Sequence, residues 1–381
     1  MPTSFDAIVL GAGMAGASIA AELAPQRKVL LLEVEDQPGR HSTGRSAAMF
    51  FESYGNATVR ALTCASRAFL EQPPEGFADV SLMTPRAAMF VANEEGLPRL
   101  DALFAAPDAA PTLQRLTAAQ ALARVPILRR EWLAGAAIDE SGCDMDVAAI
   151  HQGYLRTARR AGAQLVLGAS EVATRRHAGA WRLRSRAGDF NAPLLVNATG
   201  AWADVVAQAT GARRVGLQPM RRTALTLPIP PGLEVRDWPL TIDVDETVYF
   251  KPDAGQLLLS PANEDPMEAC DVAPEELDIA LAVHRFETLT TMPVARINRR
   301  WAGLRSFVAD RSPVAGFDPQ VEGFFWLAGQ GGYGIQMAPA LARAAAALLL
   351  GQAPPSDIAA LGVTALALSP ARASLKGAAQ A

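Results

Sequence analysis

The N-terminal segment contains the pattern that most restricts the fold of this chain. An apolar run at Ala7–Leu10 leads into a turn with Gly11, Gly13 and Gly16, then a helix of small residues and a second apolar run at Lys28–Leu32. Short apolar runs of this kind are typical of strands buried on both faces of a parallel sheet. The sequence therefore predicts that the chain begins with a βαβ unit.

Each glycine of the turn has its own physical reason in a dinucleotide-binding unit. Gly11 permits the tight turn, Gly13 lets the backbone approach a pyrophosphate, and Gly16 lets helix and strand pack closely. The helix N-terminus offers free N–H groups and a positive dipole end to the phosphates. Glu33 ends the second strand, where it is placed to accept hydrogen bonds from an adenosine ribose. A lone glycine pattern often marks close packing only, but the complete unit favours a bound dinucleotide.

The composition excludes several classes of protein. The 381 residues are 50% hydrophobic and 19% charged, which suits two or three domains with a large core. A formal net charge of -4 gives no general attraction to nucleic acid. Three widely spaced cysteines indicate neither a disulfide framework nor a metal site, so we expect a cytoplasmic protein. No secretory signal or bilayer-spanning run is evident, and a peripheral membrane contact is left open.

The later part of the chain alternates between two kinds of pattern. A polar and basic stretch at residues 37–48 suits contact with an extended cofactor better than a core position. The apolar strand at 193–201 runs into a glycine turn and a helix, which indicates a return to the nucleotide-binding domain. Residues 216–299 form proline-punctuated strands with one helix, and a glycine-rich loop at 329–336 precedes a long Ala/Leu helix.

Five motifs in this order resemble the D-amino-acid oxidase superfamily of FAD-dependent oxidoreductases, alongside glycine and sarcosine oxidases. They are the first glycine turn with Glu33 and the segments 41–48, 197–202, 301–305 and 329–336. The resemblance is greatest to bacterial D-arginine and D-amino-acid dehydrogenases and covers the chain except its tail. It implies an α/β (α+β) fold, with a discontinuous Rossmann-type domain that binds FAD noncovalently and a mixed β-sheet substrate domain.

The resemblance also implies domain boundaries. The FAD-binding domain is expected to comprise residues 1–75, 145–215 and 300–351. The substrate-binding domain is expected to comprise residues 76–144 and 216–299, followed by a peripheral C-terminal tail at 352–381.

In the family, four regions hold the cofactor. The 42–48 segment lines the pyrophosphate and the flavin, the 198–200 turn and the Val172 region hold the adenosine half, and the 331–336 loop lies beside the flavin pyrimidine ring. A glycine turn that opens a helix aims N–H groups and a dipole at N1 and C2=O, where negative charge develops when flavin accepts a hydride. Besides Gly11, Gly13, Gly16 and Glu33, the expected cofactor residues are Ser42, Thr43, Arg45, Ser46, Ala47, Ala48, Val172, Ala198, Thr199, Gly200, Trp202, Gly331, Gly332, Tyr333, Gly334, Ile335 and Gln336.

The expected substrate residues fix an amino acid through its carboxylate. A guanidinium fork binds a carboxylate bidentately, and similar enzymes have arginines at the positions of Arg222 and Arg305. The resemblance adds Tyr249 as a hydrogen-bond donor to the carboxylate and Tyr54 as part of a mobile lid. The backbone carbonyl near Gly332 is expected to accept a hydrogen bond from the amine.

Some positions depart from the family pattern. Met49 stands where related dehydrogenases often have histidine, so no histidine base is expected there. Residues 83–91 are expected to form one strand, and Ala87 and Ala88 stand on it where an arginine-selective member would carry an acidic residue, which favours neutral or apolar substrates. Glu52 is the counter-evidence, because it shares strand alternation with Tyr54 and is placed to reach a basic side chain.

Other charged and titratable residues receive a structural interpretation. Strand alternation puts Arg221 opposite Arg222, so we expect Arg221 to be a solvated surface residue. His151, His177 and His284 fall in no recognised site motif and are expected at the surface or paired in the interior.

The predicted reaction is oxidative deamination of a D-amino acid by a dehydrogenase. A hydride moves from Cα of the amine-neutral substrate to flavin N5, and the imino acid is hydrolysed to a 2-oxo acid and ammonia. The D configuration comes from the resemblance alone, and the electron acceptor is a quinone-type molecule or O2. One alternative is oxidation of glycine, sarcosine or a 2-hydroxy acid.

Two further alternatives belong to different classes of protein. A tRNA-modifying flavoprotein would need a basic surface, which the charge balance does not offer. A noncatalytic FAD-binding subunit is disfavoured by the intact Arg222, Tyr249 and Arg305.

Overall fold

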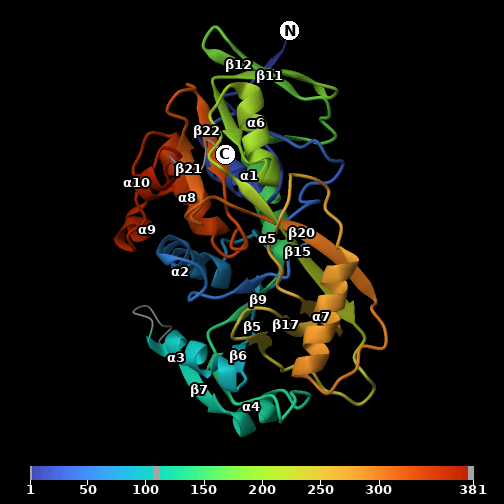
Figure 1. The fold of residues 1–381 in the computed structure, drawn as a ribbon. Coiled ribbons are helices and arrows are strands. Elements are labelled where there is room, and N and C mark those ends of the chain that lie inside the picture. The colour runs from blue at the N-terminus through green and yellow to red at the C-terminus, as the bar shows by residue number, and fades with distance from the viewer. Residues whose placement is uncertain (1, 106–111, 376–381) are drawn as a thin grey trace.

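The structure is a computed structural model that describes residues 2–105 and 112–375. Residues 1, 106–111 and 376–381 lie outside the described residues, so the predicted segments 1–75, 76–144 and 352–381 are described only in part. Figure 1 shows a parallel sheet with its helices toward one end of the molecule and a large mixed sheet toward the other.

The N-terminal βαβ unit forms the centre of a six-stranded sheet, as the sequence predicts. It consists of β2 (Ala7–Leu10), α1 (Met14–Leu23) and β3 (Val29–Leu32). The sheet order is β10-β3-β2-β14-β22-β21, in which every pair is parallel except β21–β22. The other strands are β10 (Gln164–Val166), β14 (Leu194–Asn197), β21 (Val314–Phe317) and β22 (Phe324–Ala328). Segments far apart in sequence thus build one Rossmann-type sheet.

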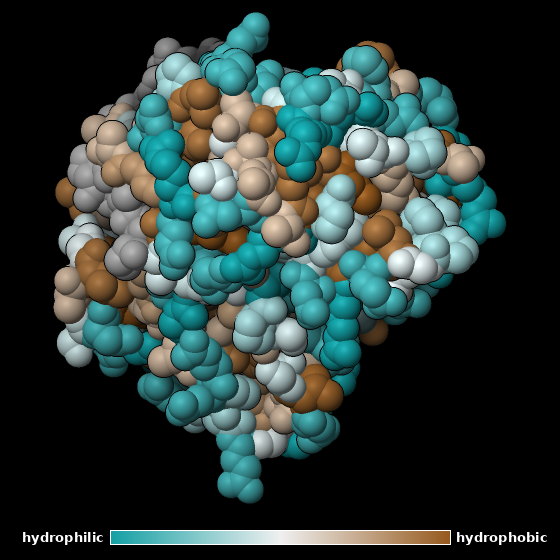
Figure 2. Space-filling view, turned by 90° about the horizontal axis from the view of Figure 1, so that it is seen from below, coloured by the Kyte–Doolittle hydropathy of each residue, from teal (hydrophilic) through white to brown (hydrophobic). Residues whose placement is uncertain are grey.

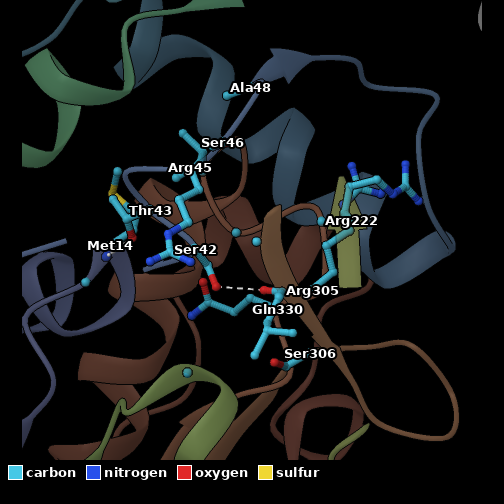
Figure 3. Close-up of a pocket in the computed structure, with 18 of the residues that line it drawn as sticks. Met14, Ser42, Thr43, Arg45, Ser46, Ala48, Arg222, Arg305, Ser306 and Gln330 are labelled. Atoms are coloured by element: carbon cyan, nitrogen blue, oxygen red, sulfur yellow. Dashed lines mark hydrogen bonds between the residues drawn. The ribbon is translucent and has the colours of Figure 1, made fainter. Parts of the chain in front are cut away.

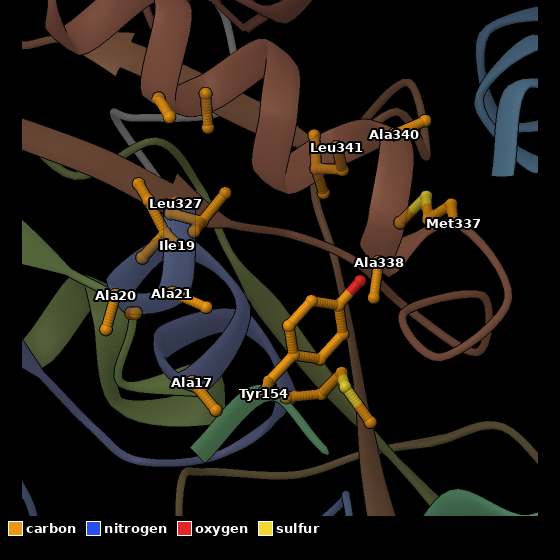
Figure 4. Close-up of a cluster of buried hydrophobic side chains, with 14 of the residues drawn as sticks. Ala17, Ile19, Ala20, Ala21, Tyr154, Leu327, Met337, Ala338, Ala340 and Leu341 are labelled. Atoms are coloured by element: carbon orange, nitrogen blue, oxygen red, sulfur yellow. The ribbon is translucent and has the colours of Figure 1, made fainter. Parts of the chain in front are cut away.

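Helices with small side chains cover one face of this sheet. Helix α1 packs against α5 (Val147–Arg160) and α8 (Ala338–Leu349). Figure 4 shows Ala17, Ala20 and Ala21 of α1 near Tyr154 and the start of α8, all within one buried cluster. Because alanine side chains are short, the helices lie close to one another and to the sheet.

A second layer covers the opposite face of the parallel sheet. It consists of α6 (Ala203–Thr210) and a four-stranded sheet. The strands of that sheet are β1 (Thr3–Ser4), β11 (Ala173–His177), β12 (Ala180–Ser185) and β13 (Gly188–Ala192). Ile8 and Leu10 face this layer, whereas Val9 faces the helices, as expected for a strand buried on both sides.

The large sheet has the order β19-β15-β18-β17-β16-β6-β8-β7, with β20 also paired to β15. Its strands are β6 (Ala88–Ala92), β7 (Leu113–Thr117), β8 (Gly135–Asp139), β15 (Gln218–Leu227), β16 (Leu240–Asp243), β17 (Tyr249–Asp253), β18 (Gln256–Ser260), β19 (Asp265–Pro266) and β20 (Arg299–Phe307). Helix α7 (Glu276–Leu289) packs on this sheet, where Phe286 meets Phe250 edge-on at 5.2 Å between ring centroids. Helices α3 (Leu97–Ala105) and α4 (Ala118–Arg124) lie against β6, β7 and β8.

A small sheet and one helix lie between these two units. Strands β4 (Met49–Phe50), β9 (Cys143–Met145) and β5 (Met83–Pro85) form the sheet, and α2 (Ala57–Glu71) packs on α8. Helix α2 begins at the N-cap Asn56, whose side chain accepts a hydrogen bond from the Val59 amide at 3.0 Å.

The described part of the predicted tail lies at one side of the molecule and is anchored there (Figure 1). Helices α9 (Ser356–Ala360) and α10 (Ala365–Leu368) each bury one apolar side chain. The Arg372 guanidinium is buried and donates two hydrogen bonds to Asp310, at 2.7 and 2.9 Å. Such a bidentate pair fixes this segment to the loop that precedes β21.

Figure 2 shows small hydrophobic patches between hydrophilic residues on the face seen from below. Within the described ranges, no helix has the length and apolar character needed to cross a bilayer.

Candidate active site

A cavity of about 810 Å³ is lined by residues of both the parallel sheet and the large sheet. Figure 3 shows Met14, Ser42 and Thr43 on one side of this cavity and Arg222 and Arg305 on the other. The predicted cofactor residues that line it are Gly11, Gly13, Glu33, Ser42, Thr43, Arg45, Ser46, Ala47, Ala48, Val172, Ala198, Thr199, Gly200, Trp202, Gly331, Gly332, Gly334 and Ile335. The predicted substrate residues Tyr54, Arg222, Tyr249 and Arg305 line it as well.

The first glycine turn leaves no room for a Cβ at Gly11 or Gly16 and little at Gly13. Gly11 has φ +92°, and a Cβ on it would lie 2.6 Å from the Ala198 carbonyl oxygen. A Cβ on Gly16 would lie 1.8 Å from the Gly11 carbonyl oxygen, and one on Gly13 would lie 3.3 Å from Thr43 Oγ1. The turn is therefore a cradle of bare backbone at the N-terminus of α1.

Two backbone donors at this helix start already have partners within the protein. The Ala12 amide donates to Glu33 Oε2 at 2.7 Å, and the Met14 amide donates to Thr43 Oγ1 at 3.0 Å. The other oxygen of the buried Glu33 carboxylate accepts from the Glu35 amide at 3.1 Å. Each carboxylate oxygen has a second lone pair, so these bonds hold Glu33 in place and leave it able to accept from a ligand hydroxyl.

Arg45 connects the 42–48 segment to the large sheet. Its guanidinium donates to the Val272 and Ala302 carbonyl oxygens at 3.0 and 3.1 Å and pairs with Asp271. In return, Trp301 Nε1 donates to the Arg45 carbonyl oxygen at 3.0 Å. The charge of Arg45 is thus compensated inside the protein, although the residue lines the cavity.

Three predicted cofactor residues do not line the cavity but support residues that do. Gly16 lies beneath Gly11 in the turn. Tyr333 packs edge-on against Tyr54, with 4.9 Å between ring centroids. Gln336 is buried, and its Oε1 accepts a hydrogen bond from the Phe51 amide at 3.1 Å.

The two predicted substrate arginines lie on one face of the β15–β20 pair. In the antiparallel register Arg305 is opposite Met220, and Arg222 is opposite Gly303. Residues two apart along a strand share a face, so both guanidiniums lie on the same side of the sheet. A Cβ on Gly332 would lie 2.7 Å from Arg305 Cζ, which shows how closely the 329–336 loop packs on this guanidinium.

The two arginines lower the pKa of the neighbouring Tyr249. Burial by itself would raise the pKa of Tyr249, but the guanidiniums of Arg222 and Arg305 and a hydrogen bond with Ser260 more than offset it and hold that pKa below its ordinary value. Burial opposes the charged form of Arg305, yet Tyr54 and Tyr249 keep its pKa above the usual range. Arg305 Nη1 donates to the Tyr54 hydroxyl at 3.4 Å.

An apolar wall begins beside these polar groups. Phe51 and Leu240 are buried and contact Tyr249, Ile242 and Phe90 in one cluster. Phe90 also belongs to the neighbouring cluster that contains Leu103 and Leu113, and these leucines line the cavity too. The side of the cavity that extends along β6, β16 and α3 is therefore predominantly apolar, and Glu246 in the turn after β16 is an acidic residue of the lining.

Sequence reasoning missed a carboxylate at the site. Glu264 Oε1 lies 3.1 Å from Arg222 Nη2, 3.0 Å from Arg311 Nη2 and 3.9 Å from Arg305 Nη1. Arg222 Nε also donates to the Asn263 carbonyl oxygen at 2.8 Å. The 263–264 turn precedes β19 and carries no motif, so only the fold reveals its place behind the arginines.

The structure corrects the expectation for Arg221. Strand alternation does place it on the opposite face from Arg222, but that face is covered by α7 and is not exposed to solvent. Its guanidinium lies 2.8 Å from Asp278 and 3.2 Å from Asp265, and it also pairs with Glu275. Arg221 is therefore part of a buried ion-pair network.

Glu52 and the three histidines outside the recognised motifs do not line the cavity. Glu52 does not line the cavity, and its Oε1 lies 2.5 Å from Arg67 Nε, so its charge is directed to α2. His151 is buried with Nε2 2.9 Å from the Ala12 carbonyl oxygen, and burial lowers its pKa. His177 and His284 are exposed.

Comparison with known proteins identifies the class to which this fold and site belong. Residues 6–348 match the DAO family, whose description is FAD dependent oxidoreductase, so the chain belongs to this family. The expected FAD cofactor and α/β fold with a Rossmann-type domain are thereby confirmed.

Individual relatives are more distant. The chain is 30% identical to FAD-dependent oxidoreductase domain-containing protein 1 of Xenopus laevis over 185 residues, which are 41% of this chain and 34% of that protein. It thus matches about a third of this relative's length. It is 24% identical to glycine oxidase of Bacillus licheniformis over 92% of this chain and 94% of the relative. The crystal structure of glycine oxidase from Geobacillus kaustophilus superposes with a TM-score of 0.80 at 23% identity, covering 92% of this chain and 95% of that one.

The residues of the cavity fit FAD. The bare backbone at Gly11 and Gly13, at the positive end of α1, suits a pyrophosphate, and the Glu33 carboxylate at the end of β3 suits a ribose. The role of each individual residue toward the cofactor stays a prediction.

Proposed function

We propose that this chain oxidises D-amino acids with neutral or apolar side chains to imino acids, which water then hydrolyses to 2-oxo acids and ammonia. FAD, when bound, supplies the hydride acceptor, and the protein supplies binding, orientation and charge. The observation that carries this proposal is the pair Arg222 and Arg305 on one face of β15–β20, beside an apolar wall in the same cavity. The D configuration rests on the resemblance to D-amino-acid dehydrogenases.

The carboxylate of the substrate would bind between the two guanidiniums. Arginine matches a carboxylate with two parallel N–H donors, and partial burial strengthens each bond. Tyr249 would donate its hydroxyl proton in a third hydrogen bond, which requires the neutral phenol. Tyr54 already contacts Arg305 and would cover the same end of the site.

The amine and Cα would then be oriented by the fixed carboxylate. The 329–336 loop packs against Arg305, so its backbone near Gly332 is adjacent to the carboxylate-binding groups and would accept a hydrogen bond from the amine. A neutral amine has a lone pair to stabilise the electron-poor Cα as the hydride leaves. Orientation of this kind supplies the protein's share of the rate without a dedicated acid or base.

The side chain of the substrate would contact the apolar wall. Phe90, Leu240 and Ile242 lie next to Tyr249, so an apolar side chain would leave water as the carboxylate binds. Glu52, the one acidic residue that the sequence offered for a basic side chain, is paired with Arg67. Both observations favour D-Leu, D-Met and D-Phe over D-Arg.

Oxidation of glycine or sarcosine is the second candidate function. The glycine oxidase of Bacillus licheniformis aligns with nearly the whole chain, which favours this candidate. Against it, neither glycine nor sarcosine has a side chain to cover Phe90, Leu103 and Leu113, which line the cavity.

An anaerobic substrate panel tests both candidates. The FAD-loaded protein is mixed with D- and L-amino acids, glycine and sarcosine, and loss of the yellow flavin absorbance is followed. We expect D-Leu, D-Met and D-Phe to bleach the flavin faster than glycine, D-Arg or the L-enantiomers. Much faster bleaching by D-Arg or by glycine would overturn the proposed specificity. Reoxidation with O2 against a soluble quinone then identifies the electron acceptor.

A further inference from the structure

Glu264 lies behind the two arginines rather than in the cavity. It contacts Arg222 and Arg311 and approaches Arg305, but it does not line the cavity. Its side chain is 29% exposed, whereas those of Arg222 and Arg305 are 13% and 20% exposed. Any effect of Glu264 on a ligand must therefore act through the charge and position of the guanidiniums.

Among the described residues, Glu264 is the only carboxylate within 4.0 Å of Arg222 or Arg305. Two guanidiniums line the cavity, and Glu264 compensates one of their two charges. Arg311 also binds Glu264, but its side chain is 44% exposed, so water and salt screen its charge. One carboxylate from a ligand would compensate the remaining positive charge of the partly buried pair Arg222 and Arg305.

We propose that Glu264 determines specificity by limiting this site to ligands with a single carboxylate. A second carboxylate that extended toward Phe90 and Leu240 would leave water for apolar side chains, and the charge of Glu264 leaves the two guanidiniums with too little positive charge to compensate it. Neutralising Glu264 leaves one partly buried positive charge of the arginine pair free for the second carboxylate. This inference rests on the proposed binding of a substrate carboxylate by Arg222 and Arg305.

The test compares propionate with malonate, which have three carbons each and differ by one carboxylate. Their dissociation constants are measured at equilibrium with the FAD-loaded protein, by calorimetry and by the shift in flavin absorbance. In the unmodified protein we expect propionate to bind more tightly than malonate. In Glu264→Gln we expect the ratio of the malonate to the propionate dissociation constant to fall by about tenfold or more, since one unit charge has been removed at short range.

Two further variants separate charge from shape. Glu264→Asp keeps the charge, so its malonate-to-propionate ratio should stay near that of the unmodified protein even if both ligands bind more weakly. Glu276→Gln removes one negative charge from a surface pair with Arg300 on β20 and should leave the ratio unchanged.

Different results would contradict the role of Glu264 and the carboxylate site itself. If both ligands bind but Glu264→Gln leaves the ratio unchanged, or if Glu264→Asp shifts it equally, the proposal for Glu264 is wrong while the carboxylate site stands. If neither ligand binds the unmodified protein, the proposed carboxylate site is itself wrong, and the proposal for Glu264 fails with it.

Discussion

The two halves of the cavity are built by different means. The half beside α1 consists of bare backbone at Gly11 and Gly13 and of polar groups already bonded within the protein, such as Glu33 and Thr43. The half beside β15 and β20 contains the guanidiniums of Arg222 and Arg305. Among the described residues, only the Glu264 carboxylate lies within 4.0 Å of either of them. The first half is shaped by sterics, whereas the second is shaped by charge.

This difference shows how each half depends on the rest of the chain. A backbone cradle needs glycines at fixed positions, because a Cβ on Gly11 or Gly16 would meet a carbonyl oxygen. A pair of guanidiniums needs counter-charges that any loop can deliver, and here the loop containing Glu264 delivers one. Substitutions should accordingly affect FAD binding in the first half and ligand affinity in the second.

The largest effect is expected for Gly16→Ala in the backbone cradle. Glycine to alanine inside a helix normally stabilises it by up to about 1 kcal/mol, but here the new Cβ would lie 1.8 Å from the Gly11 carbonyl oxygen. We expect the variant to be purified without bound flavin and to melt at a markedly lower temperature. Ala20→Gly in the same helix is the control, since it introduces no clash and should retain the cofactor. Normal flavin content in Gly16→Ala would contradict the steric account.

The next largest effect is expected for Arg305→Ala in the charged half. A hydrogen bond to a charged group contributes about 1.5–3 kcal/mol, so KM for a D-amino acid should rise by about 10- to 150-fold. FAD should remain bound, because the cradle is untouched. Arg300→Ala removes an exposed arginine from the same strand and should leave KM unchanged. Loss of flavin from Arg305→Ala would instead mark Arg305 as a cofactor residue.

A smaller, pH-dependent effect is expected from Tyr249. The arginines hold its pKa below the ordinary value of 10, so its hydroxyl loses the proton at a lower pH than a free tyrosine. Below that pKa the phenol donates to a carboxylate, and above it the phenolate repels the carboxylate. The dissociation constant of propionate should therefore rise by up to about tenfold per pH unit above this pKa.

Propionate suits this measurement because it has no amine to titrate. In Tyr249→Phe the alkaline rise should disappear, and binding at neutral pH should weaken by the loss of one hydrogen bond. An alkaline rise that persists in Tyr249→Phe would assign it to another group.

The smallest effect is expected away from both halves, in the core of the parallel-sheet unit. The Tyr154 hydroxyl is buried and has no hydrogen-bond partner among the described residues, and burial raises its pKa. Removing a buried unpaired hydroxyl should increase the free energy of unfolding by about 1 kcal/mol. Tyr154→Phe is measured by urea denaturation, with flavin content and KM expected to stay constant. A clear loss of stability would reveal a partner for the hydroxyl.

The sequence predicted the half of the cavity beside α1 better than the half beside β15 and β20. Tight turns with close backbone contacts accept few residue types other than glycine. The sequence therefore predicted the strand, turn and helix from Ala7 to Leu23 and the glycine loop at 329–336. Glu264 was missed because a counter-ion leaves no spacing signal. Arg221 was misjudged because alternation gives the face of a strand but not what covers that face, which here is α7.

One expected strand shows the same limit at the level of secondary structure. The apolar stretch Met83–Val91 predicts a single strand, but the structure divides it into β5 and β6, which belong to different sheets. The division follows Pro85. The Arg86 amide still donates to the Gly142 carbonyl oxygen, next to Cys143 of β9, and from Ala88 onward the chain pairs with β8 and β16 instead. The β-propensity of these residues predicts their extended conformation, but strands distant in sequence determine which sheet β5 and β6 each join.

The lining of the cavity extends in sequence from Leu10 to Ile335. During synthesis, the glycine turn leaves the ribosome first, and the loop that packs on Arg305 emerges about 300 residues later, at roughly 5–20 residues per second. The central strand β2 must therefore wait for β14, which pairs with it, and for β22, which pairs with β14, while its apolar faces are uncovered. We therefore expect FAD to bind late in the synthesis of this protein. Before that, the N-terminal half of the nascent chain, with its apolar strands uncovered, is the part most prone to aggregate.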